Sequence, residues 1–199
     1  MTRIADIKYN DVVDCEKGFC VSFWVQGCPW HCKGCHNPQT WDFNGGKELP
    51  PDFLKIIDNA ITANGIQRNF SVLGGEPLCL ENKSLVNEVV AHVRNTFPNI
   101  KIYLWTGDTI EHLLKLNDPE INCILNNIDV LIDGPFIQEQ RDITLKLRGS
   151  SNQRILHKGK DFWYEYVDRE KINFSRDINW LRGYNIIINY TKNIRGYFI

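Results

Sequence analysis

The sequence predicts an α/β fold in which a largely parallel β-sheet is covered by helices. Strand-like and helix-like segments alternate along the chain. The strand-like segments are almost continuously apolar, as in parallel sheets that are buried on both faces. Polar and glycine-rich segments follow the strands, and folds of this class place their chemistry at the carboxyl ends of the strands. We therefore look for a functional site at that edge of the sheet.

The individual elements are predicted from the spacing of apolar residues. Residues 19–25 (FCVSFWV) form an apolar run that is rich in β-formers and ends before Gly27, which predicts a buried strand. Residues 51–64 predict a helix, because Phe53, Ile57 and Ile61 fall on one helical face. By the same reasoning we expect further strands at 70–73, 100–105, 128–132 and 144–147, and further helices at 85–97, 110–116 and 120–126.

The composition is typical of a soluble globular protein. The chain has 199 residues, of which 43% are hydrophobic and 24% are charged, enough for one domain with a small appendage. A net charge of −1 argues against binding to nucleic acid or to an anionic membrane, since both need a basic excess. There is no apolar run long enough for a membrane span and no apolar signal region at the start, so we expect a cytoplasmic protein.

The last forty residues differ in composition from the rest of the chain, because they are rich in aromatic side chains. We therefore divide the chain into a core domain, residues 1–159, and a C-terminal extension, residues 160–199, packed on the core. Within the extension, residues 162–167 and 184–190 have the pattern of strands.

Three of the seven cysteines are clustered on the loop after the first predicted strand. Cys28, Cys32 and Cys35 have the spacing C-x-x-x-C-x-x-C, which suggests a metal site. A structural zinc usually takes four protein ligands, and His31 or His36 would have to complete the set. A 4Fe–4S cluster bound by three cysteines instead keeps one iron without a protein ligand, where a substrate can bind. The other four cysteines, at positions 15, 20, 79 and 123, are scattered and are expected to pack as small hydrophobic residues.

This cysteine motif, together with Gly74-Gly75-Glu76-Pro77 after the second buried strand, resembles the radical S-adenosylmethionine enzymes. Further segments resemble one family among them, the proteins that activate anaerobic ribonucleoside-triphosphate reductase. These segments are Cys32-Lys33-Gly34-Cys35-His36-Asn37, Trp105-Thr106-Gly107, Val130-Leu131-Ile132-Asp133-Gly134 and Arg148-Gly149-Ser150-Ser151-Asn152-Gln153. The resemblance covers about three quarters of the chain, up to about Arg154.

The resemblance implies a fold, two cofactors and a partner. The fold would be a partial, shortened (β/α) barrel that is open on one side. The cofactors would be one 4Fe–4S cluster with an open iron and S-adenosylmethionine, which is cleaved reductively to give a 5′-deoxyadenosyl radical. That radical would remove a hydrogen atom from a glycine of an anaerobic (class III) ribonucleotide reductase and leave a glycyl radical. A flavodoxin or ferredoxin would donate the electron.

The resemblance also assigns roles to residues. Cys28, Cys32 and Cys35 would ligate the cluster, and no catalytic side chain is expected beyond the cluster and S-adenosylmethionine. Gly74 and Gly75 would let the backbone approach the methionyl group.

Other residues are expected to bind S-adenosylmethionine or ions around it. Glu76 would support the turn at the strand end or meet the ammonium group. Thr106 and Asp133 would hold a monovalent cation beside the carboxylate. The remaining expected contacts are with the adenine (Gly34, Cys35 and His36) and with the nucleoside end or the partner protein (Ser150 and Asn152).

Three alternatives remain at this point. One is an activase of another glycyl-radical enzyme, of the formate-lyase type, although the long insertions with extra ferredoxin-like cysteines found in some of these are absent. Another is a radical S-adenosylmethionine enzyme that acts on a small molecule. The third is a zinc or iron–sulfur interaction module, which would not need the Gly-Gly-Glu-Pro segment after the second strand.

Overall fold

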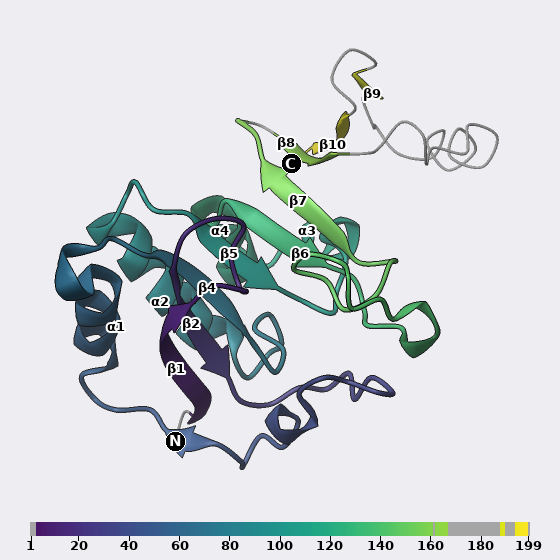
Figure 1. Cartoon of the computed structure of the whole chain (residues 1–199). Helices are drawn as coiled ribbons and strands as arrows, with labels where there is room; N and C mark the ends of the chain where they lie inside the picture. The colour runs from purple at the N-terminus through teal and green to yellow at the C-terminus, as the bar shows by residue number, and fades with distance from the viewer. Residues whose placement is uncertain (1–2, 161, 167–187, 190–193, 199) are drawn as a thin grey trace.

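The computed structural model describes residues 3–160, 162–166, 188–189 and 194–198, and its strands form one open ten-stranded sheet (Figure 1). Four neighbouring strands at its centre run parallel: β2 (Cys20–Val25), β4 (Asn69–Gly74), β5 (Ile102–Trp105) and β6 (Val130–Asp133). Antiparallel strands extend both sides. They are β1 (Arg3–Asp11) and β3 (Lys47–Glu48) next to β2, and β7 (Arg154–Lys158), β8 (Phe162–Tyr166), β10 (Ile194–Phe198) and β9 (Ile188–Asn189) next to β6. The α/β prediction is thus confirmed, and the sheet is mixed.

Four α-helices connect the central strands, each close to its predicted range. They are α1 (Phe53–Thr62), α2 (Lys83–Thr96), α3 (Ile110–Leu116) and α4 (Pro119–Asn127). Single 3-10 turns lie at Pro38–Thr40, Ala63–Gly65 and Gln138–Gln140. The last two α-helices begin with side-chain caps: Thr109 accepts the amide of His112, and Asp118 accepts those of Glu120 and Ile121.

The side chains of the central strands point alternately to the two faces of the sheet. One face packs against the helices in a single large core, which includes Phe23, Val72 and Leu104 from the strands and Ile57 and Val89 from the helices. The other face is smaller and carries Cys20, Tyr103, Val130 and Ile132, with Trp105, Leu147 and Ile155 beside them. Such two-sided burial explains why these strands are apolar throughout.

Four strands were not predicted, β1, β3, β7 and β10, and one prediction is wrong. β1 (RIADIKYND) and β7 (RILHK) are rich in polar residues, because most of their side chains are only partly buried or exposed. Residues 144–147, predicted as a strand, are in turns instead. There the Asp142 side chain accepts the Thr144 amide at 2.9 Å, and Leu147 has a left-handed φ of 59°.

The C-terminal extension begins with the predicted strand at 162–167, observed as β8. Trp163 on β8 is fully buried and belongs to the large core. Of the second predicted strand, at 184–190, only residues 188–189 are described, as β9, and the rest lies outside the described residues. The boundary between the core domain and the C-terminal extension, at residues 159/160, stays a prediction.

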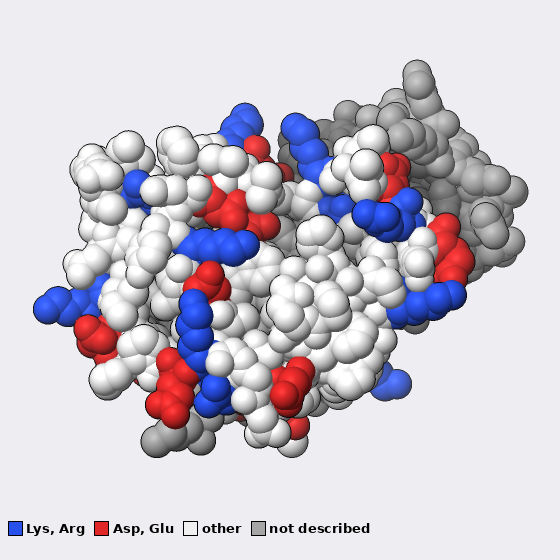
Figure 2. Space-filling model, turned by 60° about the horizontal axis from the view of Figure 1, so that its bottom comes forward, with Lys and Arg blue, Asp and Glu red and all other residues white. Residues whose placement is uncertain are grey.

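Charged residues of both signs are intermixed on the molecular face in Figure 2, and no extended basic area is visible there. This agrees with the near-neutral net charge of −1. In the described parts of the chain, no helix is both long and apolar enough to cross a membrane.

Candidate functional site

The carboxyl ends of the parallel strands surround one cavity of about 160 Å³. The cysteine loop after β2, the turns after β4 and β5, and the loop between β6 and β7 all contribute to its lining. The lining residues are Cys28, Trp30, Cys32, Cys35, Thr40, Trp41, Gly74, Gly75, Glu76, Trp105, Thr106, Gly107, Gly134, Phe136 and Gln153. The structure therefore brings the three clustered cysteines and the Gly-Gly-Glu segment together.

The cysteine loop is fixed by backbone hydrogen bonds to the segment that follows it. The amide of Gly27 donates to the Thr40 carbonyl at 2.9 Å, and the amide of Cys28 donates to the Trp41 carbonyl at 3.1 Å. Gly34 has a φ of 72°, and a Cβ there would lie 2.8 Å from Gln138. A side chain before the third cysteine would therefore be both strained and crowded.

Burial makes the sulfurs of Cys28 and Cys32 poor thiolates unless a metal displaces their protons. It raises the pKa of Cys28 to about 11 and also raises that of Cys32. Backbone amides oppose this effect by pointing at sulfur: those of Trp30 and His31 at Cys28, and that of Phe136 at Cys32.

This donor set fits an iron–sulfur cluster better than a single ion. The amide of Asn37 also donates to the Cys35 sulfur, at 3.4 Å, and hydrogen bonds to sulfur are one of the means by which proteins tune such clusters. In the described residues no three His, Cys, Asp or Glu side chains converge closely enough to hold one metal ion. A structural zinc needs that convergence, whereas a 4Fe–4S cluster takes each thiolate on a different iron.

Gly74, the last residue of β4, and Gly75 after it are required by the packing of this segment against the end of β2. The amide of Gly75 donates to the Val25 carbonyl at 2.9 Å, and the amide of Glu76 donates to the Gly27 carbonyl at 2.8 Å. A Cβ on Gly75 would lie 2.1 Å from the Gly27 carbonyl oxygen, and one on Gly74 would lie 2.6 Å from that of Val25. A larger residue at either position would thus separate the segment from the cysteine loop.

Glu76 lies at the centre of this arrangement and is only 3% exposed. Its Oε1 accepts hydrogen bonds from the Leu78 amide at 3.0 Å and from the Thr106 hydroxyl at 2.8 Å. Its Oε2 accepts from the Trp30 indole and from the Gly107 amide, both at 2.7 Å. Burial raises the pKa of Glu76, and the four donors oppose this. Because all four contacts donate to it, the carboxylate form fits the site.

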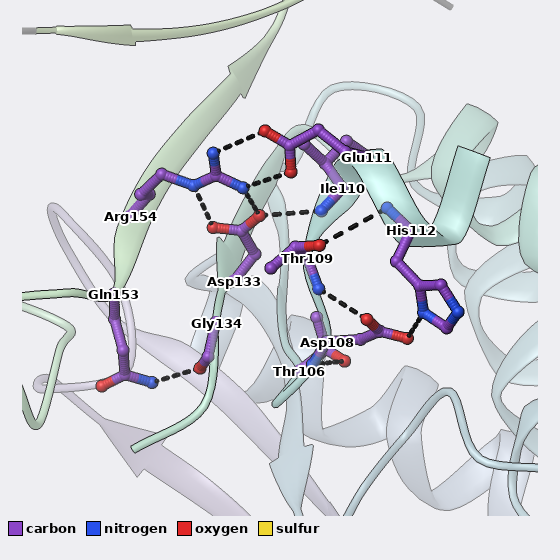
Figure 3. Close-up of polar contacts among 10 residues, drawn as sticks. All are labelled: Thr106, Asp108, Thr109, Ile110, Glu111, His112, Asp133, Gly134, Gln153 and Arg154. Atoms are coloured by element: carbon purple, nitrogen blue, oxygen red, sulfur yellow. Dashed lines mark hydrogen bonds and ion pairs between the residues drawn. The ribbon is translucent and has the colours of Figure 1, made fainter. Parts of the chain in front are cut away.

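Asp133 differs from its expected role (Figure 3). It is fully buried, and Arg154 donates to both of its carboxylate oxygens, through Nε to Oδ1 at 2.8 Å and through a second nitrogen to Oδ2. The Ile110 amide also donates to Oδ2, at 2.8 Å. Arg154 further contacts both oxygens of Glu111 at 2.7 Å. Arg154 thus occupies the place beside Asp133 where we expected a monovalent cation. We therefore propose no cation site at Asp133.

Ser150 and Asn152 shape the loop between β6 and β7 and do not line the cavity. The buried Ser150 hydroxyl accepts the Ile137 amide at 3.2 Å, and the Asn152 side chain donates to the Pro135 carbonyl at 2.7 Å. Their neighbour Gln153 does line the cavity and donates to the Gly134 carbonyl at 3.1 Å. His36 is exposed and lies outside the lining.

Several lining residues carried no signal of their own in the sequence. Trp30 and Phe136 belong to no pattern that marks a ligand site, and they reach the cavity only through the fold. Gln153 is the exception, because it ends the Arg-Gly-Ser-Ser-Asn-Gln segment that supported the resemblance.

The chain is similar to known proteins over most of its length. The model of the 4Fe-4S single cluster domain family matches residues 16–156. A protein of Vibrio cholerae is 39% identical over 149 residues, which cover 74% of this chain and 92% of that protein. One of Haemophilus influenzae is 38% identical, covering 76% and 94%, and one of Enterobacteria phage T4 is 31% identical, covering 79% and 98%. All three are named anaerobic ribonucleoside-triphosphate reductase-activating protein.

Proposed function

Because the chain belongs to the family of anaerobic ribonucleoside-triphosphate reductase-activating proteins, we propose that it activates an anaerobic ribonucleotide reductase as a radical S-adenosylmethionine oxidoreductase. Its partner would be the reductase, and a flavodoxin or ferredoxin would supply the electron. A 4Fe–4S cluster held by Cys28, Cys32 and Cys35 would supply the electron for reductive cleavage of S-adenosylmethionine, and that chemistry would serve to remove a hydrogen atom from a glycine of the reductase.

The observation that carries the proposal is the shared cavity of the three cysteines and the strand-end glycines. Cys28, Cys32 and Cys35 would ligate a 4Fe–4S cluster, each through its deprotonated sulfur. The backbone at Gly74 and Gly75 lines the same cavity, where a side chain would block the methionyl group. Glu76, next to these glycines, accepts hydrogen bonds from Trp30 of the cysteine loop and from Gly107 after β5, and so connects the two loops.

We also propose roles for residues around the cavity and a shape for the sheet as a whole. Gly34, Cys35 and His36 would border the adenine. Thr106, which lines the cavity and donates to Glu76, would lie beside the carboxylate end. The open sheet would curve as a partial (β/α) barrel, leaving one side free for a protein substrate. Ser150 and Asn152 would act indirectly, by shaping the loop that carries Gln153.

The alternatives are less well supported. A zinc module is disfavoured by donors that do not converge on one point in the described residues. A formate-lyase type activase or an enzyme for a small molecule is disfavoured by the names of the relatives quoted above.

The test is to mix the reconstituted, reduced protein with S-adenosylmethionine and an anaerobic ribonucleotide reductase under strict exclusion of oxygen. We expect a glycyl radical on the reductase by electron paramagnetic resonance, together with methionine and 5′-deoxyadenosine. A reductase whose radical-site glycine is replaced by alanine is the matched control and should give no such signal. Cleavage of S-adenosylmethionine without a radical on any anaerobic reductase tested would contradict the proposed partner.

A further inference from the structure

Trp30, between the first two clustered cysteines, is held at two points by the ends of other strands. Its indole Nε1 donates to Glu76 Oε2 at 2.7 Å. A Cβ on Gly107 would lie 2.8 Å from the same indole nitrogen, so the ring rests directly on the Gly107 backbone. Trp30 is nevertheless 43% exposed. A large aromatic side chain in this half-exposed position is therefore fixed by a specific contact and not by burial alone.

The contact involves a charged group whose field reaches the cysteines. Glu76 accepts four hydrogen bonds, and Trp30 supplies the only one that comes from the cysteine loop among the described residues. Glu76 is buried and lines the same cavity as the three clustered cysteines. In such a poorly solvated site, any group that offsets the charge of Glu76 also changes the electrostatic potential at their sulfurs.

We propose that Trp30 is a positioning residue that acts through Glu76. Its hydrogen bond holds the cysteine loop against the ends of β4 and β5, and it weakens the negative field of Glu76 at the cluster. The inference rests on the proposed function, because it assumes a cluster on Cys28, Cys32 and Cys35. Reduction makes such a cluster more negative, and its potential depends on nearby charge and hydrogen bonds. Loss of the indole N–H should therefore lower the potential, and loss of the Glu76 charge should raise it.

Four variants separate these effects. Trp30→Phe keeps an aromatic ring but removes the N–H donor. Gly107→Ala keeps the donor and displaces the ring by the added methyl group. Glu76→Gln removes the charge. Trp24→Phe is the matched control, because the Trp24 indole nitrogen is buried with no hydrogen-bond partner among the described residues.

Two properties are measured on each anaerobically reconstituted protein: the rate at which a chelator removes iron, and the midpoint potential from a redox titration followed by electron paramagnetic resonance. We expect Trp30→Phe and Gly107→Ala to lose iron roughly tenfold faster, as for loss of a hydrogen bond to a charged group, and to have lower potentials. Glu76→Gln should have a higher potential. Trp24→Phe should match the parent in both properties.

A Trp30→Phe protein with the parent's potential would overturn the inference, even if it lost iron faster, because a purely structural role predicts that pattern. A shift in the same direction for Trp30→Phe and Glu76→Gln would also overturn it. If the parent forms no reducible cluster, the proposed function itself fails, and this inference fails with it. A normal parent cluster with an unaffected Trp30→Phe variant refutes only the role of Trp30.

Discussion

At the residue scale, the seven cysteines fall into two groups, three that line the cavity and four that do not. Cys28, Cys32 and Cys35 line the cavity, whereas Cys15 and Cys20 are buried on the smaller sheet face. Cys79 and Cys123 are partly buried and are not among the lining residues. Spacing along one loop is visible in a sequence, so this division could be predicted.

We expect Cys32→Ala to abolish a stable cluster, because only two of the three proposed ligands remain. Iron content after reconstitution and cleavage of S-adenosylmethionine should both fall to background. Cys123→Ala, the same change outside the cavity, should keep the parent's iron content. Full cleavage by Cys32→Ala would refute the assignment of that ligand.

Contacts between distant residues could not be predicted in this way. Trp30 and Glu76 are 46 positions apart, and only the meeting of β2 and β4 brings them together. Asp133 illustrates the same difficulty, because a strand-end carboxylate suggests a ligand until its partner Arg154 is known. The chemistry of a carboxylate depends on its neighbours, and a sequence does not reveal them.

The carboxyl group of Asp14 should make the stability of the fold depend on pH. Burial, with Asp11 nearby, raises the pKa of Asp14 from 3.8 to about 6. The folded state then binds more protons than the unfolded state between these values, so this group reduces stability as pH rises from about 4 to about 6. Asp14→Asn should therefore raise the free energy of unfolding by about 1–2 kcal/mol at pH 7 and by much less below pH 4. Urea denaturation across this range is the measurement, and a gain independent of pH would contradict it.

At the scale of the elements, the central strands could be predicted because their side chains are buried on both faces of the sheet. β2, β4, β5 and β6 are apolar because helices cover one face and loops cover much of the other. β1 and β7 lie beside them with many polar side chains, and neither has the continuous apolar run that marks the central strands. The alternation of Ile143, Leu145 and Leu147 with polar residues predicts a strand at 144–147, yet Ile143 is 83% exposed and the segment forms turns.

The contact of Arg154 with Asp133 and Glu111 joins β7, β6 and α3, and its removal should destabilise all three. Arg154→Met leaves a fully buried carboxylate without its partner, which costs about 3–5 kcal/mol in comparable pairs. Glu111→Gln changes a carboxylate that is 20% exposed, and it should cost less than about 1 kcal/mol. Denaturant unfolding of both variants is the measurement. Equal losses would show that burial of Asp133 is not the dominant cost.

At the scale of the whole molecule, the beginning of the C-terminal extension is part of the main core. Trp163 is completely buried although it lies beyond the predicted boundary at residue 159. We expect Trp163→Ala to lower the free energy of unfolding by about 3–5 kcal/mol. Leu80→Ala, at a side chain that is 77% exposed, should change it by less than about 0.5 kcal/mol. An unchanged stability of Trp163→Ala would mean that the extension does not pack on the core.

The open sheet and the cavity lined by Cys28, Cys32 and Cys35 lead to one central claim: S-adenosylmethionine binds at an iron that the three cysteines leave open. The most direct test is electron paramagnetic resonance of the reconstituted, reduced protein with and without S-adenosylmethionine. We predict a reduced 4Fe–4S signal whose shape changes when S-adenosylmethionine is added, with about four irons per chain. A protein that binds one zinc and gives no such signal, or a cluster signal that S-adenosylmethionine leaves unchanged, would contradict the claim.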